Sequence, residues 1–596
     1  MPPSIPFTPA RKPGRRERLK EAAFLAALSV ACMLLTVWAL QLWRADLGAP
    51  FANGGDSFVH GAFAESVAEN GTYLRTPRLG APTGADLSDF PQTDYLHMAL
   101  IGLLSLVMPA YPNAINVYYL LTFPLAALFG AWALRRWGAS RWASAAGGLL
   151  FAFAPYHLAR GEGHLFLSAY FLVPVALVLA VEVAGETPPL FPGPGPASFF
   201  ARHRLGALLA CVLLALSNVY YAFFSAFFIA VAGFFGAIRH RSRRHLVSAG
   251  VMIGAIVLTS AIAVTPTLAY RLRSGPNPSG FVRNPGQAIV YGLKLDEMLL
   301  PADGHRVPAL ARLKATYHEG MRRVGRYMDN EAVSSSSLGV VASVGLLGLF
   351  GWLFYALARR GGPSSEGGLL ERLALLAVAG FLLGSVGAFG SLVAFVLPQI
   401  RSYNRISIFL GFLALGAVAL AVDAAGRRRG AWVAAGLAAG VLVVGMLDQT
   451  SPASVPDYAG IAARYRADDA FVRRVEGRLP KGVSVLQLPY MGYPEPGGDV
   501  VGMREYDPLV GYLHSRSLRW SYGAMKGRPT DLLLKRLSEL PVPELVREAR
   551  AQGFSAVWVD CAGFADGGAA VRQELSSLTS GTPLVSPDAR YAVFRL

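Results

Sequence analysis

The sequence contains few cysteines, few charged residues and none of the common motifs of soluble enzymes. Three of its 596 residues are cysteines: Cys32 and Cys211 lie in apolar runs, and Cys561 stands alone near the C-terminus. This spacing excludes a disulfide framework and a Cys-x-x-Cys metal site. The chain also has no Gly-x-x-x-x-Gly-Lys loop, no Gly-x-Gly-x-x-Gly after a strand and no His-Glu-x-x-His. A cytosolic enzyme that uses nucleotide sugars therefore has no support.

Apolar residues are abundant instead. They make up 53% of the chain, whereas charged residues make up 16%, and this composition indicates a polytopic membrane protein. The net charge of +17 does not indicate nucleic acid, because the arginine clusters lie at the ends of apolar runs, where they set membrane orientation. The basic segment 1–20 is expected to be cytoplasmic, and the run that follows it to be a retained first span.

The basic clusters predict how the chain crosses the membrane. A span needs about 20 apolar residues, and the run Tyr95–Ala110 is shorter. If it crossed, Arg135 and Arg136 would lie outside, so we expect it to lie along the outer interface, which places every later basic cluster inside. The prediction is a transmembrane domain over 21–447 with outer loops 44–113 and 269–336. Its eleven spans are Glu21–Trp43, Ala114–Leu134, Trp142–Tyr156, Leu165–Val183, two within Leu205–Ile238 folded at 217–221, Leu246–Leu268, Ser337–Leu357, Leu369–Phe389, Ile406–Ala424 and Ala431–Leu447.

After residue 447 the long apolar runs end. Residues 448–596 are predicted to form a water-soluble, extracytoplasmic α/β domain. Strands are expected at Val483–Leu488, Phe554–Val559 and Tyr591–Leu596, and a helix over Asp531–Ala551 with Thr530 or Asp531 at its cap. The predicted fold class is therefore mainly α, a transmembrane helical bundle with a C-terminal α/β domain.

The first outer loop carries the main catalytic candidate. Asp56 follows Gly54 and Gly55 shortly after the first span, which places a carboxylate at a membrane surface. One interpretation is a catalytic base. The alternative is that Asp56 caps a helix beginning at Ser57.

Acids, histidines and arginines converge on the outer face. This combination suits a carboxylate base, orienting groups and arginines that hold a phosphate. For each of these residues the alternative is that it is simply solvated at the membrane interface. Arg401 and Arg405 could instead bind lipid headgroups, and His305 could instead structure its loop. Arg401 and Arg405 are spaced to share one helix face. The predicted substrate-binding residues are His60, Asp94, His157, Arg160, Glu162, His164, His305, Arg401 and Arg405.

The C-terminal region contains one stretch in which aromatic and polar residues alternate, Tyr512–Gly523. Aromatic faces stack on sugar rings while polar groups bond hydroxyls, so this stretch is a candidate acceptor-binding surface. The alternative is a packed loop. The candidate residues are His514, Arg519, Trp520 and Tyr522.

The architecture and the loop-one Gly55-Asp56-Ser57 resemble the GT-C superfamily of polytopic glycosyltransferases, which includes protein O-mannosyltransferases and lipid A aminoarabinose transferases. The stretch Leu149–His157, with His164 after it, is similar to bacterial members of the YfhO-like type. The resemblance implies that Asp56 deprotonates the acceptor and that the anomeric centre inverts. The chain departs from the O-mannosyltransferase pattern, since Phe90–His97 stands where those proteins carry His-Pro-Pro-Leu. It also lacks an Asp-x-Asp pair in the first loop and a Trp-Trp-Asp run, so neither a metal nor a cofactor is expected.

These observations predict a glycosyltransferase of the bacterial cytoplasmic membrane, with its N-terminus inside and its C-terminal domain outside. The expected partners are a polyprenyl-phosphate-linked sugar donor, membrane lipid, and a glycan, lipid or protein acceptor, without nucleic acid. Two other classes stay open. One is a transporter or flippase of lipid-linked glycans, and the other is a non-catalytic partner in envelope polysaccharide assembly.

Overall fold

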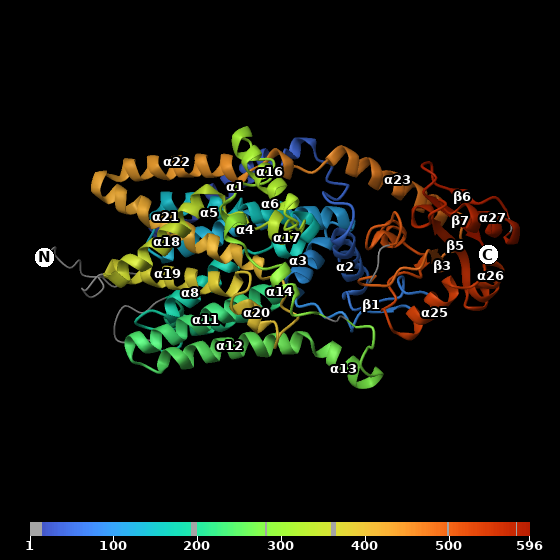
Figure 1. The fold of residues 1–596 in the computed structure, drawn as a ribbon, viewed down its shortest axis with the longest axis horizontal. Coiled ribbons are helices and arrows are strands. Elements are labelled where there is room, and N and C mark those ends of the chain that lie inside the picture. Colours follow the sequence, from blue (N-terminus) through green and yellow to red (C-terminus); the bar gives the residue numbers. More distant parts are fainter. Residues whose placement is uncertain (1–14, 192–198, 281–282, 359–364, 497–499, 580) are drawn as a thin grey trace.

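The computed structural model describes residues 15–191, 199–280, 283–358, 365–496, 500–579 and 581–596. A long helical bundle carries a smaller α/β unit at one end (Figure 1). Among the described residues, eight helical stretches are long and apolar enough to cross a membrane, so the predicted class, a mainly α multi-pass membrane protein, is confirmed. These stretches are α1 (Arg15–Ala39), α4 (Tyr111–Arg136), Glu162–Val183, α11 (Val219–His240), α12 (Arg244–Ala263), α18 (Gly339–Ala358), Tyr403–Arg429 and α22 (Ala431–Gln449).

The count of eleven spans stays a prediction. The three remaining spans fall on α5 (Arg141–Ala152), α10 (Arg204–Ser217) and α19 (Ser365–Gly384), which are not among the eight. The long apolar run 205–238 does divide where expected, because Asn218 is extended between α10 and α11 and its side chain accepts a hydrogen bond from the backbone N–H of Tyr220.

Arginine-bearing helix ends gather at one end of the bundle, called here the basic end. Arg141, at the start of α5, lies 3.2 Å from Glu21 on α1, and Arg239, at the end of α11, lies 3.3 Å from Glu371 on α19. The turns joining α11 to α12 and α21 (Ser407–Arg429) to α22 also lie opposite the α/β unit (Figure 1). Of the predicted basic segments, residues 1–14, Arg359 and Arg360 lie outside the described residues.

The opposite end, which carries the α/β unit, is called the domain end. Since α1 starts and α4 finishes at the basic end, the chain between them stays at the domain end. It holds α2 (Asp56–Asn70), β1 (Arg75–Thr76), β2 (Ala85–Asp86) and α3 (Tyr95–Ser105). Both ends of α3 therefore lie at the domain end, which is consistent with the prediction that this segment does not cross. Which end faces the cytoplasm stays a prediction.

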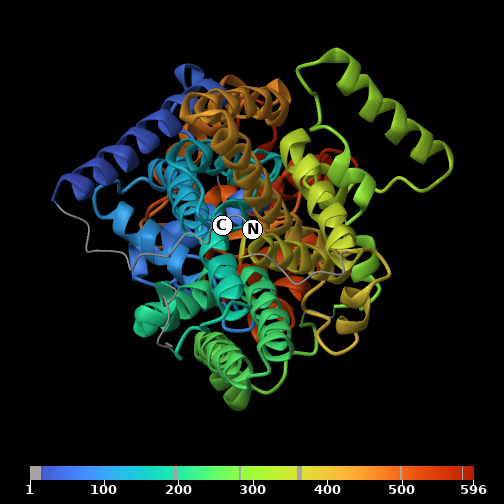
Figure 2. The same cartoon turned by 90° about the vertical axis from the view of Figure 1, so that its left-hand side faces the viewer.

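A long segment joins α12 to α18, and parts of it pack on the bundle, where Leu293 N donates to Gly384 O at 2.8 Å. Viewed from the basic end, its α16 stands away from the packed helices (Figure 2). The helices of this segment are α13 (Thr265–Ser274), α14 (Gln287–Val290), α15 (Leu295–Leu299), α16 (Pro308–Arg323) and α17 (Glu331–Ser334).

The α/β unit is built on one five-stranded sheet, of order β4-β3-β5-β7-β6. β3 (Ser484–Leu488) pairs in parallel with β4 (Arg519–Trp520) and β5 (Phe554–Asp560), whereas β7 (Tyr591–Arg595) is antiparallel to β5 and to β6 (Leu584–Val585). The three predicted strands are therefore confirmed. The accompanying helices are α23 (Tyr458–Glu476), α24 (Val510–His514), α25 (Pro529–Ser538), α26 (Val542–Ala551) and α27 (Ala569–Leu578).

The predicted helix over 531–551 is two helices, because Pro541 has no N–H and restricts the residue before it. The predicted cap was wrong as well. Arg528 is the N-cap of α25, with Pro529 at its first position. The Asp531 carboxylate instead accepts hydrogen bonds from Gly527 N at 2.8 Å and Tyr490 Oη at 2.6 Å.

The first loop is hydrogen-bonded to the edge of this sheet. Trp520 N donates to Arg78 O at 2.8 Å, and Ala81 N donates to Trp520 O at 2.9 Å, so residues 78–81 run beside β4. The buried Arg78 guanidinium also donates to Tyr512 O at 3.1 Å. The loop that carries Asp56 is therefore held by the α/β unit, and α2 packs against α24.

Candidate functional site

Two helix breaks lie on either side of the segment that carries the predicted site residues Arg160, Glu162 and His164. The chain leaves helical geometry between α5 and α6 (Pro155–Arg160), and again between α7 (Leu165–Ser168) and α8 (Val173–Val183). Carbonyl groups freed within a membrane need protein partners. Tyr170 Oη donates to Phe151 O at 2.8 Å, and Tyr221 Oη donates to Leu167 O.

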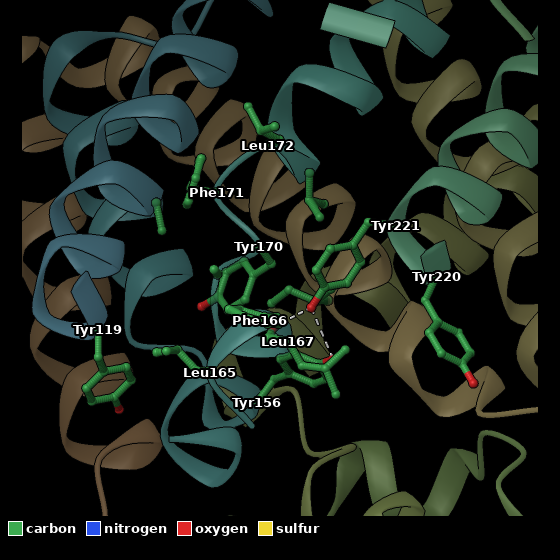
Figure 3. Close-up of a cluster of buried hydrophobic side chains, with 14 of the residues drawn as sticks. Tyr119, Tyr156, Leu165, Phe166, Leu167, Tyr170, Phe171, Leu172, Tyr220 and Tyr221 are labelled. Atoms are coloured by element: carbon green, nitrogen blue, oxygen red, sulfur yellow. Dashed lines mark hydrogen bonds between the residues drawn. The ribbon is translucent and has the colours of Figure 1, made fainter. Parts of the chain in front are cut away.

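Tyr156, Tyr170 and Tyr221 lie close together around these breaks (Figure 3). Tyr156 and Tyr221 face each other with their hydroxyl oxygens 3.2 Å apart, and Tyr170 packs edge-on against Phe151 with ring centroids 5.0 Å apart. This packing fixes the short segment 160–164, which carries Arg160, Glu162 and His164.

Asp56 is the first residue of α2, directly after Gly55, whose φ of +57° favours glycine. No side chain caps α2, and the hydrogen bonds of this turn are made by Ser57, whose Oγ accepts from Gly54 N at 2.9 Å. The cap alternative is therefore not supported. The Asp56 side chain is 49% exposed, and its Oδ2 lies 3.5 Å from Nε2 of His164. A solvent-accessible carboxylate thus faces an imidazole.

Next to this pair lies a buried ion cluster of two arginines and one glutamate. Arg405 Nη2 donates to both carboxylate oxygens of Glu331, at 3.0 and 3.2 Å, and Arg160 Nη1 donates to one of them. Burial alone would raise the pKa of Glu331, but the Arg405 and Arg160 guanidinium groups outweigh it and hold that pKa well below its usual range. The cluster therefore keeps one net positive charge.

Some N–H donors of the two arginines are unused. Nε and Nη2 of Arg160 and Nε of Arg405 are buried and have no hydrogen-bond partner among the described residues. Buried donors without partners are costly. Nε and Nη2 form one edge of a guanidinium, a fork that matches phosphate or carboxylate oxygens. The Arg160 edge is thus suited to an anion.

Glu162 shapes the first loop. Its Oε1 accepts hydrogen bonds from the backbone N–H groups of Phe51 at 3.0 Å and Ala52 at 3.3 Å. Asn116 supports the same loop through a hydrogen bond to Ala49 O at 2.8 Å. These contacts lead the chain from α1 toward Asp56.

Asp94 and His60 lie in less polar surroundings. Burial raises the pKa of Asp94 to about 7, although a hydrogen bond from Asn218 Nδ2 at 2.9 Å acts against the shift. His60 lies one turn after Asp56 on α2 and packs on Phe166 with ring centroids 4.8 Å apart. Burial lowers the pKa of His60 to about 4, so this imidazole is neutral at physiological pH.

Two predicted histidines have other partners. Both ring nitrogens of His157 are taken, by Thr122 Oγ1 at 2.9 Å and Ala152 O at 2.7 Å, which favours a packing role over substrate contact. His305 lies 3.2 Å from Asp448 at the end of α22. This contact favours the loop-structuring alternative for His305.

The predicted pairing of Arg401 and Arg405 on one helix face was wrong. α21 begins at Ser407, and Arg401 precedes a short 3-10 turn, Tyr403–Ile406. The Arg405 guanidinium lies over Tyr220 at 4.2 Å, whereas that of Arg401 lies over Tyr291 at 5.2 Å. Arg160, and not Arg401, is the second arginine that shares Glu331 with Arg405.

The predicted sugar-binding surface on 512–523 was also wrong, and the packed alternative holds. Trp520 is 0% exposed, because β4 lies between β3 and the first loop. His514 and Tyr522 are also buried, and Arg519 donates to Pro77 O at 3.1 Å. The aromatic faces are therefore not free to stack on a sugar.

Three further residues border the site. The sequence placed Glu331 among the polar residues of the outer loops without a specific role, and it gave no indication of Arg504 or Glu505. Glu331 comes from the segment between α12 and α18, and Arg504 and Glu505 come from the α/β unit. A Cβ placed on Gly54 would lie 3.7 Å from Arg504 Nη1. Burial raises the pKa of Glu505. A hydrogen bond from Tyr506 acts against this shift, and the charge of Asp56 adds to it. No local pattern marks these residues, because each is brought in from far along the chain.

The fold and the site define a multi-pass membrane protein with a polar, partly buried cluster of charged side chains where its helices meet an α/β unit. Residues 73–325 match the family model DUF6311, described as a domain of unknown function, which covers less than half of the chain. None of the curated proteins compared with the sequence matches it. Among the described residues, no group of three or more metal-ligating side chains could hold a metal ion.

Several solved structures are similar to this chain. Arabinofuranosyltransferase AftD from Mycobacteria has 17% identity and a TM-score of 0.49, over 98% of this chain and 40% of its own. ArnT from Cupriavidus metallidurans, bound to undecaprenyl phosphate, has 12% identity and a TM-score of 0.43, over 97% of this chain and 98% of its own. The oligosaccharyltransferase AglB from Archaeoglobus fulgidus, in complex with an inhibitory peptide and a dolichol-phosphate, has 10% identity and a TM-score of 0.44, over 96% of this chain and 74% of its own.

These similar structures are GT-C glycosyltransferases, the superfamily that the sequence resembles. The chain spans 40% of the length of AftD. All three TM-scores lie below 0.5.

Proposed function

We propose that this protein is a membrane glycosyltransferase that moves a sugar from a polyprenyl-phosphate donor to an extracytoplasmic acceptor, with inversion at the anomeric carbon. One observation carries the proposal. The accessible carboxylate of Asp56 lies beside His164 and next to a buried Arg160–Glu331–Arg405 cluster that has an uncommitted guanidinium edge. A base and an anion site are the two parts that such a transfer requires.

Asp56 is the proposed base. A sugar hydroxyl is too weakly acidic to attack unaided, so a carboxylate must take its proton as the new bond forms. Asp56 is half-exposed and can meet an acceptor arriving from water. Arg504 and Glu505 border this open side, so the α/β unit lines the path of the acceptor.

Arg160 and Arg405 form the proposed phosphate site. The leaving group is a lipid phosphate, which departs as an anion and needs cationic partners more than an acid. Arg160 lies directly before the span Glu162–Val183, and Arg405 lies within the first turn of the span Tyr403–Arg429. The phosphate of a membrane lipid lies at this depth, at the end of the hydrocarbon core.

The experiment measures sugar transfer by the purified protein, from a panel of synthetic undecaprenyl-phosphate sugars to an envelope extract. Asp56→Asn keeps the size and hydrogen bonding of the side chain but removes the proton acceptor, so the rate should fall about 100-fold or more. Asp46→Asn is the matched control, because Asp46 belongs to the same loop and pairs with the exposed Arg466.

Full activity of Asp56→Asn would remove Asp56 from the mechanism, and Asp94 or Glu162 would become the candidate base. A loss of activity in Asp56→Asn could not be explained by helix capping, since asparagine caps a helix as well as aspartate does. Failure of the unmodified protein to transfer from every donor in the panel would overturn the proposed class of reaction.

A further inference from the structure

His164 lies between the two halves of the site. Its Nε2 is 3.5 Å from Asp56 Oδ2, and it follows Arg160 by four residues, across the turn that contains Glu162. The side chain is 40% exposed. The charged groups that act on it are Asp56 on α2, Arg160 on α6, Glu331 on α17 and Arg405 before α21. An imidazole therefore connects the proposed base to the proposed phosphate site.

The charges of the site change during the proposed reaction. A polyprenyl-phosphate sugar is a phosphodiester with one negative charge, which matches the single net positive charge of the Arg160–Glu331–Arg405 cluster. After transfer the phosphate is a monoester with a second negative charge near neutral pH. This second charge arises as the proton of the acceptor hydroxyl reaches Asp56, so the product state has excess negative charge beside Arg160.

We propose that His164 accepts the proton from Asp56 and holds it as an imidazolium beside the leaving phosphate. This inference rests on the proposed function. The acceptor oxygen bonds to the anomeric carbon, the bond from that carbon to the phosphate oxygen breaks, and its electron pair stays on the phosphate. The hydroxyl proton passes to Asp56 and then to His164 Nε2. Asp56 is thereby restored as a carboxylate, and the proton leaves later to the phosphate or to water.

The electrostatics of the site favour this transfer only once the phosphate carries its second charge. In the empty site burial, together with the Arg160 and Arg405 guanidinium groups, disfavours a positive charge on His164, so its imidazole is neutral. A phosphate dianion at Arg160 and Arg405 compensates these groups, so that an imidazolium is flanked by two anions, the phosphate and Asp56. Histidine is the side chain whose proton binding changes most easily near neutral pH. His164 is therefore a positioning residue for the proton.

The test measures the number of protons taken up when the lipid binds, and not the rate of sugar transfer. Binding of undecaprenyl phosphate, the lipid bound in the ArnT structure, is measured by titration calorimetry at pH 7.5 in two buffers with different enthalpies of protonation. At this pH the phosphate is already mainly dianionic, since its second pKa is about 6. The unmodified protein should take up most of one proton on binding. His164→Gln, which keeps a polar side chain without a basic nitrogen, should lose this uptake.

The matched control is His203→Gln. His203 is exposed directly before α10 and packs on Phe199 of α9 (Phe199–Arg202). The backbone N–H of Phe200 donates a hydrogen bond to Glu182 near the end of α8. The His203→Gln variant should bind the lipid with the same proton uptake as the unmodified protein. His164→Asn is a second variant in case the glutamine variant unfolds, and thermal unfolding of each variant is followed in parallel.

The outcomes separate the two proposals. If the unmodified protein does not bind undecaprenyl phosphate, the proposed function is overturned. If it binds without taking up a proton, or if His164→Gln binds with the same uptake, the role of His164 is overturned while the phosphate site stands. A folded His164→Gln that binds more weakly with unchanged uptake would show a structural role only.

Discussion

At the scale of single residues, the division of Arg160 into two edges is the feature on which the phosphate site depends. Nη1 is committed to Glu331, while Nε and Nη2 are buried and without a partner among the described residues. A lysine at this position could keep the ion pair with Glu331 but could not present a second, fork-shaped edge, because an ammonium group is a point charge.

We therefore expect Arg160→Lys to bind undecaprenyl phosphate more weakly by about 1.5–3 kcal/mol, the contribution of a charge-assisted hydrogen bond, which is a factor of about 10–150 in Kd. The control is Arg401→Lys, because Arg401 lies over Tyr291 and not in the cluster. Titration of the two purified variants gives the comparison. Equal weakening in both would show that the effect is not specific to the Arg160 edge and would return these arginines to headgroup binding.

At the scale of elements, the first loop is attached to the α/β unit by a buried ion pair as well as by backbone hydrogen bonds. Arg528 Nε donates to Asp89 Oδ2 at 2.6 Å, and its Nη1 and Nη2 donate to Ser274 O at 2.8 Å and Gly275 O at 3.0 Å. One guanidinium thus joins the α/β unit to the first loop and to the C-terminal end of α13. The contact fixes the loop that presents Asp56.

Removal of this guanidinium takes the shorter of two ion pairs from the Asp89 carboxylate, whose side chain is 1% exposed. Arg271 Nε, 3.5 Å from Asp89 Oδ1, and Asn277 Nδ2, 3.1 Å from Oδ2, remain as partners. Arg528→Gln should therefore destabilise the protein by about 1.5–3 kcal/mol, the contribution of a hydrogen bond to a charged group, and it should also increase cleavage of the first loop by protease. Arg547→Gln is the control, since the Arg547 side chain is 71% exposed and its loss should cost about 0.5 kcal/mol or less. Thermal unfolding in detergent measures both. Similar midpoints for the two variants would contradict an energetic role for this contact.

At the scale of the whole molecule, the two ends of the bundle differ in charge and in architecture. Arg141 and Arg239 lie with their acidic partners at the basic end, and the α/β unit and Asp56 lie at the domain end (Figure 1). Arginine-rich short loops stay in the cytoplasm. The domain end should therefore face away from the cytoplasm, on the side where polyprenyl-linked sugars are proposed to be used.

Two serine-to-cysteine variants test this orientation. Ser242 lies in the turn between α11 and α12, and Ser577 is exposed on α27. The three native cysteines are buried and should give little background. In intact cells a membrane-impermeant maleimide should label Ser577→Cys, and it should label Ser242→Cys only after permeabilisation. The reverse pattern would invert the orientation and place Asp56 on the cytoplasmic side.

Local sequence was sufficient for features that depend on composition, periodicity and spacing. Long apolar runs predicted the bundle, since each needs only its own length to match a membrane. Basic run ends predicted that Tyr95–Ala110 does not cross, and β-type patterns predicted β3, β5 and β7. The position of Asp56 after two glycines predicted an accessible carboxylate, which is what the structure contains.

The sequence alone determined which segments are apolar, which ends are basic and where a carboxylate follows the first span. The tertiary structure decided that Glu331 joins Arg160 to Arg405, that Arg401 turns to Tyr291, and that Trp520 is buried beneath the first loop. The physical reason is the separation along the chain. Burial and ion pairing depend on which distant segments meet, and the local pattern around a residue carries no record of the partner that covers it or neutralises its charge.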